Sequence, residues 1–190
     1  MEPVWQREPG KGSYARPERE RRFLLRALPE GSVEPVDIED RYVVGTRLRL
    51  RRMGDGTGAA TYKLSQKVPD GADPSLVMIT NTYLSEAEYE TLLVLPALTV
   101  SKTRYRSPGQ GPVSADDFHG PLAGLVLAEL PVGEEGGRPG AGLPDTAPPE
   151  TVAEVTDDPR FTGGELARTG SADLRRLLAG FPGLPDRGEP

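Results

Sequence analysis

Much of the chain alternates apolar and polar residues, and side chains two apart on a β-strand share a face. This pattern predicts strands over residues 18–25, 40–52, 62–68, 78–84, 100–105, 113–118 and 125–132. The glycine-rich residues 54–58 predict a hairpin turn, and His119-Gly120-Pro121 predicts another turn. Roughly seven or eight short strands with short connections favour an antiparallel sheet that closes on itself.

Two segments have helical spacing instead. Ser85 followed by Glu88 is a capping-box signature, which predicts a helix that begins after Ser85 and ends before Pro96. Its apolar face would consist of Tyr89, Leu92 and Leu93. Ser171 is the predicted cap of a last helix, whose apolar residues recur at helical spacing: Leu174, Leu177, Leu178 and Phe181. The predicted fold class is therefore α+β, dominated by a β-barrel with a few outer helices.

The ordered part of the chain is predicted to be one domain. Glycine and proline are frequent, with 23 and 20 residues of 190, and many lie outside the alternating segments. We interpret residues 1–17 and 182–190 as disordered tails, and residues 133–150 as an insertion rich in glycine and proline. The domain then spans residues 18–181, which is long enough for a single hydrophobic core.

Composition and charge exclude several classes of function. The chain has no cysteine, which excludes disulfides, thiolate metal sites and cysteine nucleophiles. It has no Walker-type phosphate loop and no apolar run long enough for a membrane-spanning helix. A net charge of −6 disfavours a nucleic-acid surface. We expect a cytoplasmic protein, monomeric or homodimeric, that binds neither nucleic acid nor membrane.

Several predicted strands carry their charges on one face. These co-facial sets are Glu18, Glu20 and Arg22; Arg47, Arg49 and Arg51; Lys63, Ser65 and Lys67; and Lys102, Arg104 and Arg106. In later strands, Asp116 shares a face with Phe118, and Glu129 has apolar neighbours. The ordinary interpretation is a sheet whose charged face meets water. Like charges on adjacent strands repel, however, so we favour faces that point into a barrel and converge on a polyanion.

Such an interior suits phosphate chemistry. Arginine binds phosphate oxygens in a bidentate way and stays charged when it is partly desolvated. The carboxylates of Glu18, Glu20, Asp116 and Glu129 can hold a divalent cation between themselves and the phosphate oxygens. His119, the only histidine, is interpreted as a turn residue, and residues 157–158 as a turn or helix cap.

These residues resemble, in order, the motifs of the triphosphate tunnel metalloenzyme (CYTH) family. Residues 18–22 resemble its opening Glu-x-Glu-x-Lys signature, residues 47–51 its arginine strand and residues 62–67 its lysine strand. Lys102-Thr103-Arg104-Tyr105 is similar to its Lys-x-Arg-Tyr segment. Residues 116–129 resemble the later Asp-x-Phe and Gly-Leu segment, and residues 155–166 the closing Val-Thr-x-Asp stretch.

The resemblance implies an eight-stranded antiparallel tunnel that binds a triphosphate compound together with Mg²⁺ or Mn²⁺. It implies metal ligation by Glu18, Glu20, Asp116 and Glu129, with Glu18, Glu20 and Arg22 in catalytic roles. The implied phosphate-binding residues are Arg47, Arg49, Arg51, Lys63 or Lys67, Lys102 and Arg104. Lys63 and Lys67 share a face, so the pattern does not choose between them.

Three positions depart from the family pattern. Arg22 replaces a lysine, and Pro131 stands two residues after Glu129, where the family has a second carboxylate. The strand at 78–84 has Thr80 and Thr82 where the family has co-facial glutamates. Fewer carboxylates bind a divalent cation more weakly.

The leading hypothesis is a metal-dependent triphosphatase that hydrolyses inorganic tripolyphosphate. The second hypothesis is a tunnel that binds polyphosphate or a nucleotide with little turnover. An adenylate cyclase or a thiamine triphosphatase is less favoured, because the six tyrosines are scattered and predict no aromatic cluster for a ring.

Overall fold

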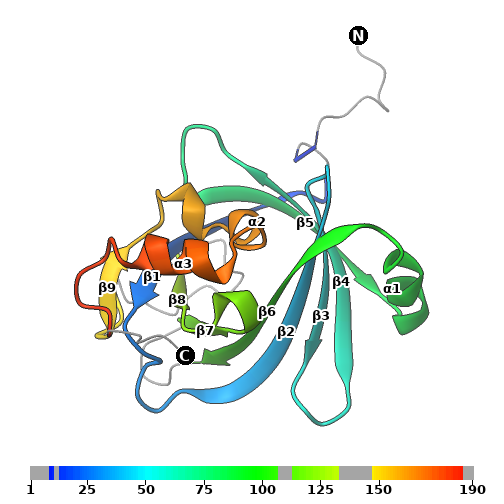
Figure 1. Cartoon of the computed structure of the whole chain (residues 1–190). Coiled ribbons are helices and arrows are strands. Elements are labelled where there is room, and N and C mark those ends of the chain that lie inside the picture. Colours follow the sequence, from blue (N-terminus) through cyan, green and yellow to red (C-terminus); the bar gives the residue numbers. More distant parts are fainter. Residues whose placement is uncertain (1–8, 11–12, 107–112, 133–146, 186–190) are drawn as a thin grey trace, which may run out of the picture.

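The computed structural model describes residues 9–10, 13–106, 113–132 and 147–185. Within these residues the strands form one antiparallel sheet: β1 (Arg16–Leu25), β2 (Val33–Val43), β3 (Leu48–Gly54), β4 (Ala60–Pro69), β5 (Leu76–Leu84), β6 (Ala97–Arg106), β7 (Ser114–Phe118), β8 (Val126–Pro131) and β9 (Thr151–Glu154). The order is β5-β4-β3-β2-β6-β7-β8-β1, and β1 pairs again with β5, so eight strands close into a barrel (Figure 1). The predicted fold class is confirmed.

Strand β1 closes the barrel and has two partners along the same edge. Its residues 16–19 pair with β5, and its residues 23–25 pair with β9, the ninth strand outside the closed set. Between these pairings the Glu20 amide donates to the Ser75 carbonyl at 3.1 Å, and the Val155 amide donates to the Arg22 carbonyl at 2.8 Å. The other edge of β1 pairs with β8. The backbone of β1 is therefore held along its length on both sides.

The helix α1 (Glu86–Leu92) follows β5 and packs on β4, where the rings of Tyr62 and Tyr89 lie 4.7 Å apart (Figure 1). The predicted capping box is confirmed. The Ser85 amide donates to the Glu88 carboxylate at 2.7 Å, and the Ser85 hydroxyl accepts from the Glu88 amide. The remaining helical elements are η1 (Gly120–Leu122), η3 (Pro159–Phe161), α2 (Gly163–Leu166) and α3 (Ser171–Leu178).

An apolar cluster closes one end of the barrel. Strand residues Leu24, Val100, Phe118 and Leu127 pack with Leu122, Leu125, Val155, Phe161, Leu166 and Leu174 of the helical elements and loops. As predicted, residues 177, 178 and 181 of the last helical segment also pack on this cluster. Because neighbouring strands are antiparallel, β1, β2, β4 and β7 run toward the closed end. The open end is formed by the starts of these strands and by the final residues of the other four.

A second apolar cluster covers the opposite face of β1, β7 and β8. It contains Phe23, Leu25, Ala115, Ala128 and Leu130, all of them buried. The sequence correctly placed residues 23 and 25 opposite the charged residues of the first strand, because the period of two is strict in β1.

One strand prediction is wrong. Residues 40–52 form two strands, the end of β2 and the start of β3, joined by a turn over residues 44–47. Gly45 has a φ of 74° there, a conformation that favours glycine. The pattern also missed residues 33–39 of β2 and the whole of β9, whose Thr151–Glu154 residues pair with β1.

Smaller differences concern the ends of the chain. Gly170 is the N-cap of α3, and Ser171 is its first helical residue, without a side-chain cap. Residues 133–146 of the predicted insertion, and residues 1–8 and 186–190 of the predicted tails, lie outside the described part of the chain. Among the described residues, no helix has the length and apolar character needed to cross a membrane.

Candidate active site

The charged strand faces point into the lumen of the barrel. Glu129 on β8 interacts electrostatically with Lys67 on β4 and with Arg51 on β3. Neither β3 nor β4 adjoins β8 in the sheet. Side chains on strands this far apart in the order meet only across the lumen of a closed barrel. The face shared by these three residues is therefore the inner one.

Strand register assigns the other ionisable groups to the same inner face. The cations are Arg22, Arg49, Arg51, Lys63, Lys67, Lys102 and Arg104, and the carboxylates are Glu18, Glu20, Asp40, Asp116 and Glu129. Among the described inner-face residues that are not exposed, cations thus outnumber carboxylates by seven to five, although the whole chain has a net charge of −6. The interior attracts anions, whereas the molecule as a whole does not.

Asp40 lies between two arginines. Its Oδ1 accepts from Arg51 Nε and its Oδ2 from Arg51 Nη2, both at 2.6 Å, and Arg49 Nε lies 3.4 Å from Oδ1. Burial alone would raise the pKa of Asp40, but Arg49 and Arg51 outweigh it and hold the pKa at about 2. Asp40 is therefore ionised at neutral pH, where it fixes Arg51 by a bidentate contact and leaves Arg49 less firmly held.

The sequence analysis did not select Asp40. In one continuous strand, residues 40 and 51 would point to opposite faces because they are an odd number apart. The turn over residues 44–47 reverses the chain and places Asp40 directly across from Arg51. The signal for this turn was Gly45, a lone glycine between two stretches of alternating residues.

A second buried carboxylate holds the cations of β6. Both oxygens of Asp116 accept hydrogen bonds: Oδ1 from Arg104 Nε at 2.6 Å, and Oδ2 from Arg104 Nη2 at 2.7 Å and from Lys102 Nζ. Arg104 Nη2 also contacts Glu129, which lies on β8. Asp116 is almost fully buried, and its oxygens are occupied by these cations. It acts here as a counter-ion for Lys102 and Arg104.

Three other carboxylates gather on β1 and β8. The Glu129 carboxylate raises the pKa of Glu20, and burial and Glu18 raise it further against the opposing effect of Lys67. Glu18 itself pairs with Lys67 Nζ at 2.7 Å. Across from Glu20 on β8 lies Pro131, which supplies no oxygen ligand. In the described part of the chain, no three acidic or histidine side chains are already assembled as a metal site.

Two inner-face arginines have a buried donor with no partner in the described part of the chain. Arg22 Nη2 donates to the Thr156 carbonyl at 2.9 Å, but Arg22 Nε has no hydrogen-bond partner. Arg49 Nε is likewise buried and has no hydrogen-bond partner. An unsatisfied buried donor on a cation is destabilising, and an anionic ligand would satisfy it.

The two lysines of β4 differ in their partners. Lys67 pairs with Glu18, whereas Lys63 forms no ion pair with any described residue. Burial lowers the pKa of Lys63, and the nearby charges of Arg51 and Arg49 lower it further. The sequence left these two lysines equivalent, whereas in the described part of the chain Lys67 alone of the two forms an ion pair.

Comparison with solved structures supports the fold. No family model matches the chain, and no curated protein matches it. Among solved structures, the inorganic triphosphatase NE1496 is 26% identical, covers 79% of this chain and 93% of its own, and has a TM-score of 0.51. A second structure of NE1496, described as a hypothetical protein, covers 80% of this chain and 99% of its own, with 26% identity and a TM-score of 0.53. The chain therefore has the fold of the triphosphate tunnel (CYTH) structures, to which it is similar.

A third solved structure, the PH1819 protein from Pyrococcus horikoshii OT3, is 22% identical over 62% of this chain and 80% of its own, with a TM-score of 0.45.

The β5 wall of the tunnel differs from the expectation. Thr80 and Thr82 face outward, because Asn81 is paired with the inner-face Ser65, and Tyr83 with Lys63. The Ser65 hydroxyl donates to Asn81 Oδ1 at 2.6 Å, and Lys63 Nζ lies 5.7 Å from the Tyr83 ring centroid. Tyr83 is 71% exposed at the open end of the tunnel. This wall therefore presents an amide and an aromatic ring to the lumen.

Some predicted residues lie outside the tunnel. Arg47 is exposed in the turn before β3 and does not join the arginine pair. His119 is exposed, and its Nε2 lies 2.8 Å from the Thr103 hydroxyl, which donates to Asp37 Oδ1 at 2.8 Å. Thr103 has the opposite parity to Lys102 in β6, so this chain of hydrogen bonds is on the outer surface. His119 precedes η1 as the predicted turn residue.

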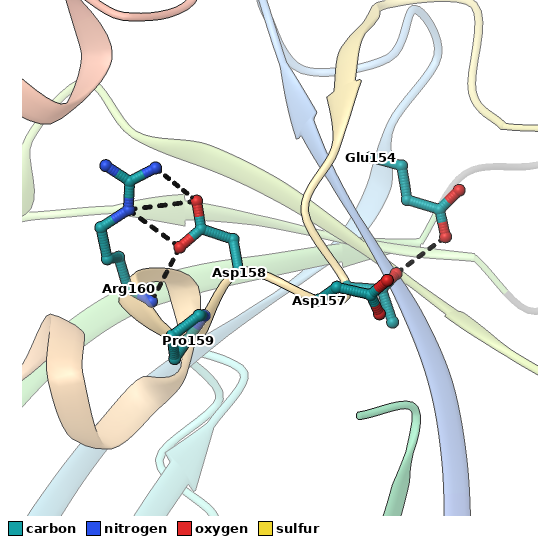
Figure 2. Close-up of a pocket in the computed structure, with 6 residues that line it drawn as sticks. Glu154, Asp157, Asp158, Pro159 and Arg160 are labelled. Carbon is teal, nitrogen blue, oxygen red and sulfur yellow. Dashed lines mark hydrogen bonds and ion pairs between the residues drawn. The ribbon is translucent and has the colours of Figure 1, made fainter. Parts of the chain in front are cut away.

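An open hollow also lies outside the barrel, after β9 (Figure 2). It is lined by Glu154, Thr156, Asp157, Asp158, Pro159 and Arg160. The Asp158 carboxylate turns toward Arg160, accepts from its backbone amide at 3.0 Å and pairs with its guanidinium at 2.6 Å (Figure 2). Asp158 thus caps η3, as the sequence predicted for this pair of aspartates.

Proposed function

We propose that this tunnel protein binds a triphosphate compound in its lumen and hydrolyses it with a divalent metal ion, inorganic tripolyphosphate being the main substrate. The main support is the unpaired positive charge on the inner face. Among the described residues, Lys63 forms no ion pair with a carboxylate, and the Nε atoms of Arg22 and Arg49 have no acceptor. The neighbour NE1496, which is described as an inorganic triphosphatase, supports the same class of reaction.

The donor set on β1 and β8 fits a hard divalent cation. Glu18, Glu20 and Glu129 offer oxygen ligands, and their mutual repulsion, seen in the raised pKa of Glu20, would be relieved by a cation. We assign these three residues to Mg²⁺ or Mn²⁺. Asp116 is left out of the set because Lys102 and Arg104 occupy its oxygens. A bound ion of this kind supplies charge neutralisation and a more acidic water.

The cations on the remaining wall would hold the phosphates. Arg49 and Lys63 are the least satisfied of them, whereas Arg51 and Arg104 are held in place by Asp40 and Asp116. Fixed guanidinium groups need no reorganisation when negative charge moves between phosphate oxygens during transfer. Arg22 would act in the same way from β1. In this arrangement a triphosphate lies between a cationic wall and a carboxylate wall.

The decisive experiment is phosphate release from tripolyphosphate with Mg²⁺ and then with Mn²⁺, compared with ATP and thiamine triphosphate. Metal-dependent turnover is the expected result. The opposing observation in the structure is Pro131, which takes the place across from Glu20 where the family has a carboxylate. A raised melting temperature with tripolyphosphate, but no phosphate release with either metal, would establish a binding protein instead.

Lys63 should contribute more to triphosphate binding than Lys67. We expect Lys63→Met to weaken tripolyphosphate binding roughly ten- to hundredfold, because it removes a charged donor that no carboxylate neutralises. Lys67→Met is the matched control, since Lys67 is already paired with Glu18. Isothermal titration calorimetry in EDTA measures both. Equal losses in the two variants would contradict this assignment.

Tyr83 favours a second candidate substrate class, triphosphates that carry an aromatic ring. Its ring lies at the open end beside Lys63, where the head group of a bound nucleoside triphosphate would emerge. Any nucleobase can stack on an aromatic side chain, because every base has a π-face. We expect Tyr83→Ala to weaken ATP binding roughly tenfold and to leave tripolyphosphate binding unchanged. Tyr83→Phe should behave like the parent protein. Tyr14→Ala removes another exposed tyrosine and is the negative control. An equal effect of Tyr83→Ala on both ligands would rule out a ring site.

A further inference from the structure

The start of α2 touches the inner face of β2 very closely. A Cβ atom added to Gly163 would lie 1.9 Å from the Tyr42 hydroxyl oxygen and 2.9 Å from the ring carbon that bears it. No side-chain carbon tolerates such distances, so any larger residue at this position would force the Tyr42 hydroxyl to move. By contrast, a Cβ at Gly164, the next residue, would meet only a flexible arginine nitrogen at 3.9 Å.

The position of Gly163 is fixed by its neighbours. Phe161 precedes it in η3 and Leu166 ends α2, and both are buried in the apolar cluster that closes the barrel. The ring of Tyr42 packs against the same cluster. The hydroxyl of Tyr42 is therefore held between the closing segment on one side and the lumen on the other.

On the lumen side, Tyr42 meets Arg49. The two residues are directly across from each other on β2 and β3. Burial raises the pKa of Tyr42 to about 12, and Asp40 also raises it, while the Arg49 guanidinium contacts the hydroxyl and opposes this shift. Asp40 holds Arg49 only loosely, since Arg49 Nε is 3.4 Å from Asp40 Oδ1 and has no hydrogen-bond partner among the described residues. Arg51, in contrast, is already fixed by the bidentate contact with Asp40.

We propose that Tyr42 is a positioning residue for the triphosphate site. Its hydroxyl lies against Gly163 and orients the guanidinium of Arg49 toward the bound phosphates. The packing at the closed end of the barrel therefore affects the affinity for the ligand. The proposal rests on the proposed function for its binding readout, because Arg49 is assigned there to the phosphates. The orientation of Arg49 itself is a property of the ligand-free protein.

The first test measures that orientation directly. In the parent protein, the guanidinium N–H groups of Arg49, assigned by their loss in Arg49→Gln, should give a slowly exchanging NMR signal. Tyr42→Phe keeps the ring but lacks the hydroxyl, so exchange of this signal should accelerate at least about tenfold, with the melting temperature little changed. An unchanged Arg49 signal in Tyr42→Phe would overturn the proposal whether or not the protein binds triphosphate.

The second test is a double-mutant cycle on tripolyphosphate affinity in EDTA. Tyr42→Phe should weaken binding about tenfold in the parent protein and have no effect in the Arg49→Gln background. Equal losses in both backgrounds would mean that Tyr42 acts independently of Arg49 and would reject the proposal. If the parent protein binds no tripolyphosphate, the proposed function fails, and the NMR result alone decides the role of Tyr42.

The third test uses the two adjacent glycines of α2. Gly163→Ala forces the Tyr42 hydroxyl away, so it should weaken tripolyphosphate binding and change the Arg49 signal as Tyr42→Phe does. Gly164→Ala adds the same methyl group one residue later, where there is room, and should change neither. A Gly163→Ala protein that melts lower but has the parent's affinity and Arg49 signal would show a purely structural contact.

Discussion

Replacing Asp40 by asparagine should lower the free energy of unfolding by about 3–5 kcal/mol, the range for breaking a buried ion pair from one side. Asp40 is 1% exposed and is the only carboxylate in an ion pair with Arg49 or Arg51 among the described residues. Asparagine fits the same space, so the loss of stability measures the removal of the charge and not a change in side-chain volume. The two guanidinium groups would then repel each other within the lumen.

Glu39→Gln is the matched control for this variant. Glu39 is the preceding residue of β2, is exposed and faces outward, so its neutralisation should change stability by no more than about 0.5 kcal/mol. Urea denaturation of the three proteins measures the difference. A loss of under about 1 kcal/mol in Asp40→Asn would show that the arginines do not depend on this carboxylate.

The Asp40 carboxylate also makes the stability of the protein depend on pH between about 2 and 3.8. The pKa of Asp40 falls from an ordinary value of 3.8 to about 2 in the folded protein. Its contribution, about 2 kcal/mol, is therefore present above pH 3.8 and is lost as the pH falls toward 2. The melting temperature of the parent protein should drop through this window. That of Asp40→Asn should drop less, because it has no carboxylate to protonate at this position.

The sequence predicted the charged faces because the period of two is kept within each strand. Glu18, Glu20 and Arg22 share the inner face of β1, and Lys102 and Arg104 share that of β6, as expected. The barrel followed from the number of strands and from the repulsion that co-facial cations would otherwise suffer. These inferences need only local geometry.

The errors arose where the face of a strand depends on where the chain turns. Because β2 and β3 were predicted as one strand, Arg47 was assigned to the same face as Arg49, and Asp40 was not assigned to that face. The turn at Gly45 instead leaves Arg47 outside β3 and places Asp40 opposite Arg51. In β5 the sequence analysis likewise compared Thr80 and Thr82 with the inner-face glutamates of the family, whereas the inner-face residue at this end of the strand is Tyr83. The partners that distinguish Lys63 from Lys67 come from strands far away in sequence, so no local pattern contains them.

Replacing Glu20 by glutamine should separate binding from turnover. Phosphate release from tripolyphosphate should fall at least about a hundredfold, because the variant removes one of the three carboxylates that we assign to the metal. In EDTA, tripolyphosphate should bind at least as tightly as before, because the lumen becomes one unit more positive. Stabilisation of the free protein by added Mn²⁺ should be lost as well.

The metal-free stability of Glu20→Gln decides whether this interpretation is correct. Glu129 is the main cause of the raised pKa of Glu20, so the two carboxylates repel each other in the absence of a cation. Removing one charge should therefore raise the melting temperature in EDTA at neutral pH, whereas a loss of packing would lower it. Glu39→Gln, on the outer face of β2, should leave turnover, Mn²⁺ stabilisation and melting unchanged. If Glu20→Gln melts lower and keeps its turnover, Glu20 is a structural residue and the metal must be sought on other carboxylates of the tunnel.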